Sequence, residues 1–190
     1  MVRVLEGIQA ARDAGLTPIK INTVVVGGEN DHEVNDLVSF FSQWADTTEL
    51  RFIEYMPFGT RLHTSVSSQE LRARLAARWT LEAENPNGHA NGPARTWRVI
   101  ESGLRVGFIS ALSEHFCATC NRLRLMADGR LRTCLAHEDT PSLRDLLRDG
   151  ASDDEMKATI RGMVLGKPKG HDCELDGGAV FEGSMMSIGG

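Results

Sequence analysis

The order of apolar and polar residues predicts alternating helices and strands in the first third of the chain. Apolar residues recur at helical spacing over residues 3–14. The apolar run 19–26 is rich in β-branched residues, which predicts a buried parallel strand. A second helix is expected over 32–44 with Asp31 as its N-cap, followed by a second strand over 50–56. This order is typical of βα units that form a parallel sheet or barrel.

The pattern changes after Pro57, where turn residues and shorter apolar runs begin. Ser67 is expected to cap a helix over 68–79, and the turn-rich stretch 84–92 predicts an exposed loop. The remaining predicted elements are strands over 96–100 and 104–109, which form a hairpin, and helices over 143–148 and 153–164.

The βα pattern of residues 1–57 is only about two units long, far short of a complete barrel. A sheet of that size leaves strand edges and one face uncovered. We therefore expect a missing N-terminal portion, in preference to a partner chain, to complete the sheet.

Composition and charge restrict the classes of function. The chain has 190 residues, 41% of them hydrophobic and 25% charged, and its net charge of -5 argues against a protein that wraps nucleic acid over its whole surface. No apolar run of membrane-spanning length and no signal-peptide pattern is found in the sequence. We expect a cytoplasmic protein without a membrane partner, in which disulfides are disfavoured.

Three of the four cysteines are spaced as C-x2-C-x13-C, namely Cys117, Cys120 and Cys134, and thiols at this spacing typically bind a soft metal or an iron-sulfur cluster. Two interpretations stay open. With His137 the cysteines would form a Cys3His zinc site, suited to a nucleic-acid or protein-binding module. Without a fourth protein ligand they suit a four-iron cluster that leaves one iron open to a substrate atom. Cys173 lies far away, and we expect it to be a free thiol.

The residues between Cys120 and Cys134 predict a hairpin that closes this site. Two short alternating runs flank Asp128-Gly129, a dipeptide that favours a two-residue turn because both positions tolerate positive φ. In that register Cys134 lies opposite Leu123, and the third thiol returns to the first two.

The same register separates the thiol from two nearby arginines. Arg122 and Arg124 would point to the face opposite Cys134, so a bulge near Asn121 would be needed to bring these charges and the thiols together. Such a convergence is of interest because arginines dominate this stretch and would form a local anion site.

Polar residues interrupt the two predicted strands of the first unit. Lys20 and Asn22 share one face of the first strand. A lysine on a central strand is costly to bury unless it meets an anion, whereas on an edge strand it would lie in water. Arg51 on the second strand is either a boundary residue in solvent or a phosphate ligand. The roles of Asn22 and Glu54 stay open.

Short motifs spread over nearly the whole chain carry a resemblance to a known family. The sequence resembles the C-terminal portion of the GTP 3′,8-cyclase family, the radical S-adenosylmethionine enzymes of molybdenum cofactor (molybdopterin) biosynthesis. The matching motifs are Lys20-Ile21-Asn22, Arg51-Phe52-Ile53-Glu54-Tyr55-Met56-Pro57, Cys117-x2-Cys120-Asn121-Arg122-Leu123-Arg124, Cys134-Leu135 and Met186-Ser187-Ile188-Gly189-Gly190.

The resemblance implies an α/β fold: residues 1–60 as the C-terminal part of an incomplete (β/α)6 TIM-type barrel, followed by an α+β domain over 61–190 that binds an iron-sulfur cluster and GTP. It also implies a lyase reaction. In this family a first four-iron cluster, on a C-x3-C-x2-C loop, cleaves S-adenosylmethionine to a radical that abstracts the ribose C3′ hydrogen of GTP. C3′ then attacks C8, giving (8S)-3′,8-cyclo-7,8-dihydroguanosine 5′-triphosphate. This chain contains no C-x3-C-x2-C.

The resemblance further implies roles for individual residues, all of them expectations. Cys117, Cys120 and Cys134 would hold a second [4Fe-4S] cluster with an open iron, and Met56 would lie against S-adenosylmethionine. Gly189 and Gly190 would reach the active site as catalytic residues. The expected GTP-binding residues are Lys20, Arg51, Arg122, Leu123 and Arg124. We expect the chain to be inactive alone and to need the missing barrel half or a partner chain, with homodimerisation left open.

Overall fold

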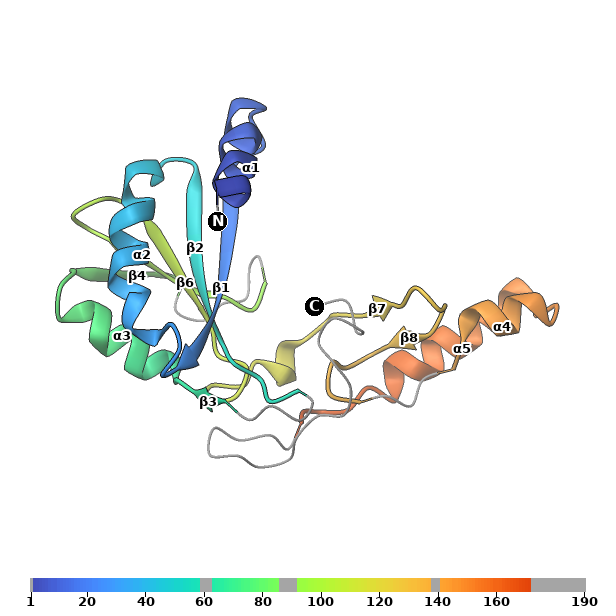
Figure 1. Ribbon diagram of the computed structural model, residues 1–190. Coiled ribbons are helices and arrows are strands. Elements are labelled where there is room, and N and C mark those ends of the chain that lie inside the picture. The colour runs from blue at the N-terminus through green and yellow to red at the C-terminus, as the bar shows by residue number, and fades with distance from the viewer. Residues whose placement is uncertain (1, 59–62, 86–91, 138–140, 172–190) are drawn as a thin grey trace. The chain divides into compact units, whose positions relative to one another are not determined.

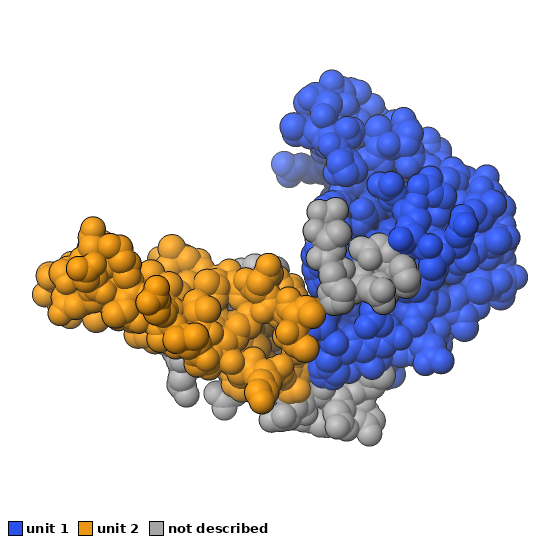
Figure 2. All heavy atoms as spheres, turned by 180° about the vertical axis from the view of Figure 1, so that it is seen from behind, with its two compact units in different colours: residues 1–56, 63–116, 174–178 blue, residues 57–62, 117–173, 179–190 orange. Residues whose placement is uncertain are grey.

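The structure, a computed structural model, describes residues 2–58, 63–85, 92–137 and 141–171. The predictions for Cys173, Gly189 and Gly190 lie outside these residues. The chain divides into two compact units (Figure 2): unit 1 comprises residues 1–56, 63–116 and 174–178, and unit 2 comprises residues 57–62, 117–173 and 179–190. This division follows packing within the chain, and the family-domain boundary at residue 60 stays a prediction.

Unit 1 is built on a mixed sheet of six strands in the order β3-β1-β2-β6-β5-β4 (Figure 1). The central strands β1, β2 and β6 are parallel, and the others pair antiparallel to them. Their bounds are β1 (Ile19–Gly27), β2 (Thr48–Glu54), β3 (Thr64–Ser65), β4 (Leu81–Asn85), β5 (Arg95–Val99) and β6 (Arg105–Ile109).

Helices cover one face of this sheet. They are α1 (Val2–Asp13), α2 (Val34–Phe41), which is flanked by 3-10 turns at Asp31–Glu33 and Ser42–Trp44, and α3 (Ser68–Ala76). Figure 1 shows α2 and α3 on the same side of the strands, and their apolar residues join those of β2 and β6 in one core. Phe52 and Phe108 lie fully buried at its centre, with ring centroids 5.9 Å apart. The core explains the apolar periodicity of both helices.

Most predicted elements of unit 1 are present, with three corrections. Residues 84 and 85, expected to begin a loop, instead belong to strand β4, which starts at Leu81 and pairs with β5. The second predicted strand begins at Thr48 and ends at Glu54 rather than spanning 50–56. Asp31 does not cap α2: its carboxylate accepts the Gly28 N–H at 2.8 Å and pairs with Arg74 at 2.8 Å. The Asp31 carboxylate therefore bonds to the Gly28 N–H and the Arg74 guanidinium instead of to the first N–H groups of α2.

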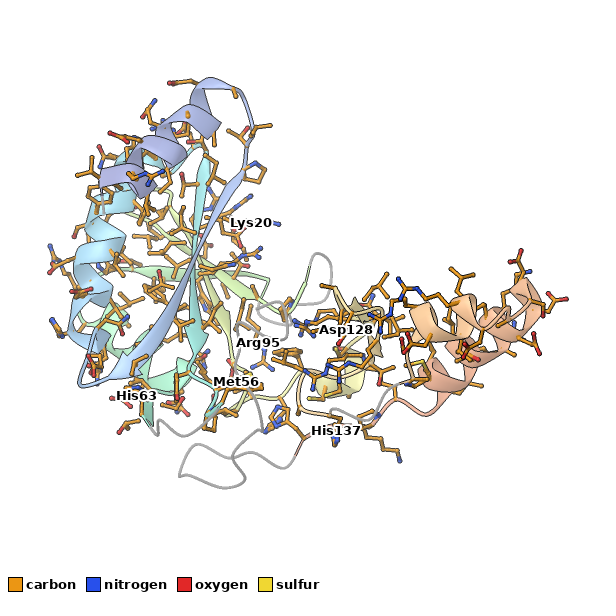
Figure 3. All side chains as sticks on the ribbon, turned by 45° about the vertical axis from the view of Figure 1, so that its right-hand side comes forward. Lys20, Met56, His63, Arg95, Asp128 and His137 are labelled. Carbon is orange, nitrogen blue, oxygen red and sulfur yellow. The ribbon has the colours of Figure 1, made fainter. Side chains whose placement is uncertain are left out.

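The other face of the sheet is lined by polar residues. Lys20 lies beside Glu49 and Asn22 beside Arg51 in the register of β1 and β2, so all four side chains share this face. Lys20 and Asn22 are exposed, and Val24 on the same face is 45% exposed. Figure 3 shows Lys20 projecting from the sheet on the side away from the helices. Within the described residues, no helix of unit 1 packs its apolar side chains on this face.

Unit 2 consists of a short hairpin and two helices. Its elements are a 3-10 turn at Cys117–Thr119, β7 (Arg124–Leu125), β8 (Leu131–Arg132), α4 (Leu143–Arg148) and α5 (Asp153–Leu165). Ser142 and Ser152 cap the two helices by accepting backbone N–H groups, and at Ser152 a capping box with Glu155 is complete.

The chain as a whole is mixed α/β, as predicted, whereas its origin as part of a barrel stays a prediction. Among the described residues, no helix has the length and apolarity needed to cross a membrane.

Candidate functional site

The β7–β8 hairpin of unit 2 turns through three residues rather than the predicted two. The Met126 N–H donates to the Arg130 carbonyl at 2.8 Å, and the Gly129 N–H donates to the Met126 carbonyl at 2.9 Å. Gly129 has a φ of +85°, the left-handed conformation that closes a three-residue loop. The predicted two-residue register was therefore wrong by one position.

This correction brings the arginines and the third thiol to one face of the hairpin. Arg124 pairs with Arg132, and continuing the same register by two residues places Cys134 opposite Arg122. The sulfur charges of Cys120 and Cys134 act on the guanidinium of Arg124. No bulge near Asn121 is needed, because the loop length alone moves Cys134 to the face of the arginines.

Gly129 also permits close packing of the hairpin on α4. Its carbonyl accepts the Leu143 N–H at 2.9 Å. A Cβ at position 129 would lie 2.3 Å from the Cβ of Arg144, a distance that real carbon atoms do not adopt. The hairpin is thus held by the helix that follows it in the chain.

The first two thiols of the site are connected by one tight turn. The Cys120 N–H donates to the Cys117 carbonyl at 3.1 Å, and all three cysteines are partly buried and free of disulfides. Burial and the neighbouring sulfurs of Cys134 and Cys120 raise the pKa of Cys117. Because thiols and not disulfides meet here, the donor set fits a soft metal or an iron-sulfur cluster.

Cys120 lies in a more positive environment. Burial opposes its thiolate, but hydrogen bonds from Arg122 and the charges of Arg122 and Lys167 outweigh that effect and lower the pKa of Cys120. Burial and repulsion from Arg122 in turn lower the pKa of Arg124. This cluster of cations is suited to an anionic group.

The segment that follows α5 contacts the thiols of both Cys117 and Cys120, a contact that the sequence does not predict. Lys167 donates to the Cys120 sulfur at 3.4 Å, and the backbone N–H of His171 bonds to the Cys117 sulfur. The only signal in the sequence is the short motif Lys167-Pro168-x-x-His171 after the end of a helix.

The predicted zinc ligand His137 is directed elsewhere. Its Nε2 lies 3.4 Å from the Gly170 carbonyl, and its own carbonyl accepts a hydrogen bond from the buried Arg132 at 3.1 Å. Among the described residues, His137 belongs to no group of three side chains close enough to hold one metal ion. Leu123, a predicted GTP-binding residue, is 43% exposed beside the arginines.

In unit 1 the second candidate anion site lies on the polar face of the sheet, the face that carries Lys20 and Asn22. Arg51 is held there by Glu49, whose carboxylate accepts its Nε at 2.5 Å, and both side chains are only about a tenth exposed. Gly107 on β6 makes room for it, since a Cβ at that position would lie 3.1 Å from the Arg51 Cγ. The structure thus places Lys20, Asn22 and Arg51 on one face, which the sequence alone had not joined.

The structure indicates the role of Glu54, which the sequence left open. It is 1% exposed, and its carboxylate accepts the N–H groups of Ser68 at 2.7 Å, Leu112 at 2.8 Å and Ser113 at 2.9 Å, together with the Ser113 hydroxyl. These bonds tie the end of β2 to the start of α3 and to the segment that leads to Cys117. Glu54 is therefore an anchor for the backbone.

A second carboxylate holds the same segment of unit 1. Glu114 accepts hydrogen bonds from Arg72 at 2.8 Å, from Arg95 and from Ser110 at 3.3 Å, while Arg72 stacks on the ring of Trp97 at 4.9 Å. Burial opposes the charge on Glu114, but these partners outweigh it and lower the pKa of its carboxyl. The segment that follows β6, residues 110–116, is thus held in one conformation by Glu54 and Glu114.

Met56 lies two residues past the last residue of β2, at the carboxyl end of the parallel strands, where it is half-buried. The preceding Tyr55 meets His63 edge to face, with ring centroids 5.4 Å apart. The carboxyl ends of parallel strands are where ligands commonly bind in α/β folds. Met56, like Lys20 and Arg51, belongs to unit 1, whereas the three cysteines belong to unit 2.

Comparison with known proteins identifies the family. Residues 48–173, two thirds of the chain, match the family described as Molybdenum Cofactor Synthesis C. The chain belongs to this family.

Three curated relatives of the chain carry the name GTP 3′,8-cyclase. The chain is 41% identical over its whole length to a GTP 3′,8-cyclase of Pseudomonas fluorescens (strain Pf0-1), of which it covers 58%. It is 44% identical over 92% of its length to a GTP 3′,8-cyclase of Rhodopseudomonas palustris (strain TIE-1), of which it covers 50%. It is 40% identical over 98% of its length to a GTP 3′,8-cyclase of Heliobacterium modesticaldum, of which it covers 58%. The chain thus spans only 50–58% of the length of these relatives.

Proposed function

We propose that this chain is the part of a GTP 3′,8-cyclase that holds a [4Fe-4S] cluster and binds GTP in molybdenum cofactor biosynthesis. The observation that carries the proposal is that Cys120 and Cys134 lie close enough to Arg124, on the β7–β8 hairpin of unit 2, for their charges to act on its guanidinium. A cluster with three thiolate ligands keeps one iron open for a substrate atom. The arginines beside it offer forked donors for phosphate oxygens.

The spacing of the thiols supports a cluster over a closed zinc site. Around one zinc ion, thiolates at 2.3 Å lie about 3.8 Å from each other in a tetrahedron. Among the described residues, the three side chains whose donor atoms lie within 4.8 Å of one another are His115, Cys117 and His171, a group that contains neither Cys120 nor Cys134. A four-iron cluster requires wider spacing, because each thiolate binds a different iron. The orientation of His137 toward Gly170 argues in the same direction.

We further propose that the polar face of unit 1 lines the interior of an incomplete barrel. Lys20 and Arg51 would face GTP there, and Met56 at the carboxyl end of β2 would lie against S-adenosylmethionine. The rest of the barrel, with the C-x3-C-x2-C loop and its radical-generating cluster, would come from residues outside this chain or from a partner. Gly189 and Gly190 would complete the catalytic site, and residues 61–190 would act as the cluster-binding domain.

Anaerobic reconstitution with iron and sulfide tests the proposal. The chain should take up about four irons, as expected for a [4Fe-4S] cluster, and should bind GTP with a change in the spectrum of the cluster. Arg124→Gln should weaken GTP binding roughly 10- to 100-fold, because a charge-assisted hydrogen bond contributes about 1.5–3 kcal/mol. Equilibrium dialysis against GTP measures this change.

Arg130→Gln is the matched control on the same hairpin. Its guanidinium is directed to Asp128, with a Nε–Oδ2 distance of 2.7 Å, and the residue is exposed. GTP affinity should change less than about threefold in this variant, as for a typical surface substitution. A colourless protein that binds one zinc ion, or equal affinity losses in both variants, would refute the proposed site.

A further inference from the structure

The segment between α5 and the end of the described chain places a cation against a cysteine sulfur. Lys167 Nζ lies 3.4 Å from the Cys120 sulfur and 2.8 Å from the Arg122 carbonyl oxygen. Within the described part of the chain these are its hydrogen-bond partners, and neither of them is a carboxylate. The positive charge of the Lys167 ammonium therefore acts on the Cys120 sulfur.

The surroundings of Lys167 are already positive. Charges of Arg122 and Lys167 both act on Cys120, and those of Arg122 and Arg132 both act on Arg124. Like charges brought together at a half-buried site repel one another unless an anion lies between them. An iron-sulfur cluster with three thiolates is such an anion, because its net charge is negative.

The same segment supplies a second donor to the site. The backbone N–H of His171 bonds to the sulfur of Cys117. Gly170 lies against the same cysteine, since a Cβ built there would be 3.8 Å from the Cys117 Cβ. Residues 167–171 thus direct one N–H group to each sulfur of the first turn. Hydrogen bonds to the sulfur ligands are among the factors that set the reduction potential of a cluster.

We propose that Lys167 is a positioning residue that donates to the Cys120 thiolate, retains the cluster and raises its reduction potential. This inference rests on the proposed function, because it requires the three cysteines to hold a cluster. The ammonium stabilises the reduced cluster, which carries one more negative charge, more than the oxidised one. Through the Arg122 carbonyl the same side chain also fixes the backbone that presents the arginines.

The test compares Lys167→Met with Lys169→Met in the full chain after anaerobic reconstitution. Lys169 is the matched control, because it is an exposed lysine two residues farther along the same segment. Two properties are measured: the rate of iron loss to a chelator, and the midpoint potential of the cluster followed by electron paramagnetic resonance. Lys167→Met should lose iron roughly 10- to 100-fold faster, as for other outer partners of metal ligands, and its potential should be more negative than that of the wild type.

Lys167→Arg keeps a cationic donor and should restore the wild-type potential and an iron-loss rate within about threefold of wild type. If Lys167→Met lacks the circular dichroism spectrum of the wild type, the comparison is made with Lys167→Gln, which keeps an N–H donor without the charge. A wild-type chain that takes up no cluster overturns the proposed function and with it this inference. A wild-type chain that is loaded normally, with potential and iron loss unchanged in Lys167→Met or Lys167→Gln, overturns the inference alone.

Discussion

Replacing Glu54 by glutamine should destabilise unit 1 by about 3 kcal/mol, because its carboxylate is buried among hydrogen-bond donors. The side chain is 1% exposed and accepts three backbone N–H groups and one hydroxyl. Glutamine has nearly the same shape, but one of its two terminal atoms is an NH2 group that cannot accept. The variant therefore tests the hydrogen bonds without opening a cavity.

The magnitude follows from the best orientation that the amide can adopt. With its oxygen toward Leu112 and Ser113, the NH2 group faces the Ser68 N–H and the Ser113 hydroxyl, which can rotate to accept. One buried N–H, that of Ser68 at the start of α3, is then left without its acceptor, at a cost of about 1–3 kcal/mol. The bonds that remain lose their charge assistance, which adds about 1 kcal/mol or more.

Urea unfolding followed by tryptophan fluorescence measures this loss selectively. All three tryptophans, Trp44, Trp79 and Trp97, lie in unit 1, so their emission reports that unit. A loss of about 3 kcal/mol should lower the urea midpoint by about 1.5 M if the slope is about 2 kcal/mol per molar urea.

Glu82→Gln is the control for Glu54→Gln, because Glu82 lies on β4 and its side chain is exposed. Its urea midpoint should stay within about 0.25 M of wild type, as for other surface substitutions. A Glu54→Gln midpoint equal to that of the control would refute the account of Glu54 as an anchor for the N–H groups of α3 and residues 112–113.

Two further predictions concern the hairpin loop of unit 2 and the acid stability of unit 1. Gly150→Ala should cost roughly 1–2 kcal/mol, because alanine is strained at the left-handed φ of that position. Gly129→Ala should destabilise the β7–β8 hairpin by more than this, because position 129 has a similar φ and a Cβ there also clashes with Arg144. Hydrogen exchange of the hairpin amides compares the two variants, and equal protection would contradict the packing argument. The pKa of Glu114 is lowered when folded, so its stabilising contribution is complete above its ordinary value of 4.5 and is lost as the pH falls below it. The stability difference between wild type and Glu114→Gln should therefore shrink between about pH 7 and about pH 3.5 in the same fluorescence assay, and a difference independent of pH would exclude this linkage.

Elements with a clear apolar period could be predicted from the sequence. The helices at 2–13, 68–76 and 153–165 and the β5–β6 hairpin are present where the periodicity placed them. Strand β4 could not be predicted, because it lies at the sheet edge next to a turn-rich stretch and has few apolar residues. Pairing with β5, a tertiary effect, determines its structure.

The sequence was sufficient to single out the cysteines of the candidate site but not to predict their geometry. The C-x2-C-x13-C spacing identified the cysteines, yet Asp128-Gly129 suits both a two-residue turn and the closing part of a three-residue loop. Packing of Gly129 on α4 accompanies the longer loop, and such contact lies beyond local sequence reasoning. Lys167 was missed for the same reason, because it is far from the cysteines in the chain.

The hairpin makes the two parts of the C-x13-C spacing unequal. A residue added between Met126 and Arg130 lengthens only the loop and leaves the pairing of Arg124 with Arg132 as it is. Successive strand residues alternate between the two faces, so a residue added between Arg132 and Cys134 would keep every cysteine in the sequence and still turn Cys134 away from Arg124. Functional relatives should therefore vary in length at the loop rather than between Arg132 and Cys134, and a motif search that tolerates any spacing would accept proteins in which the thiol and the arginine lie on opposite faces.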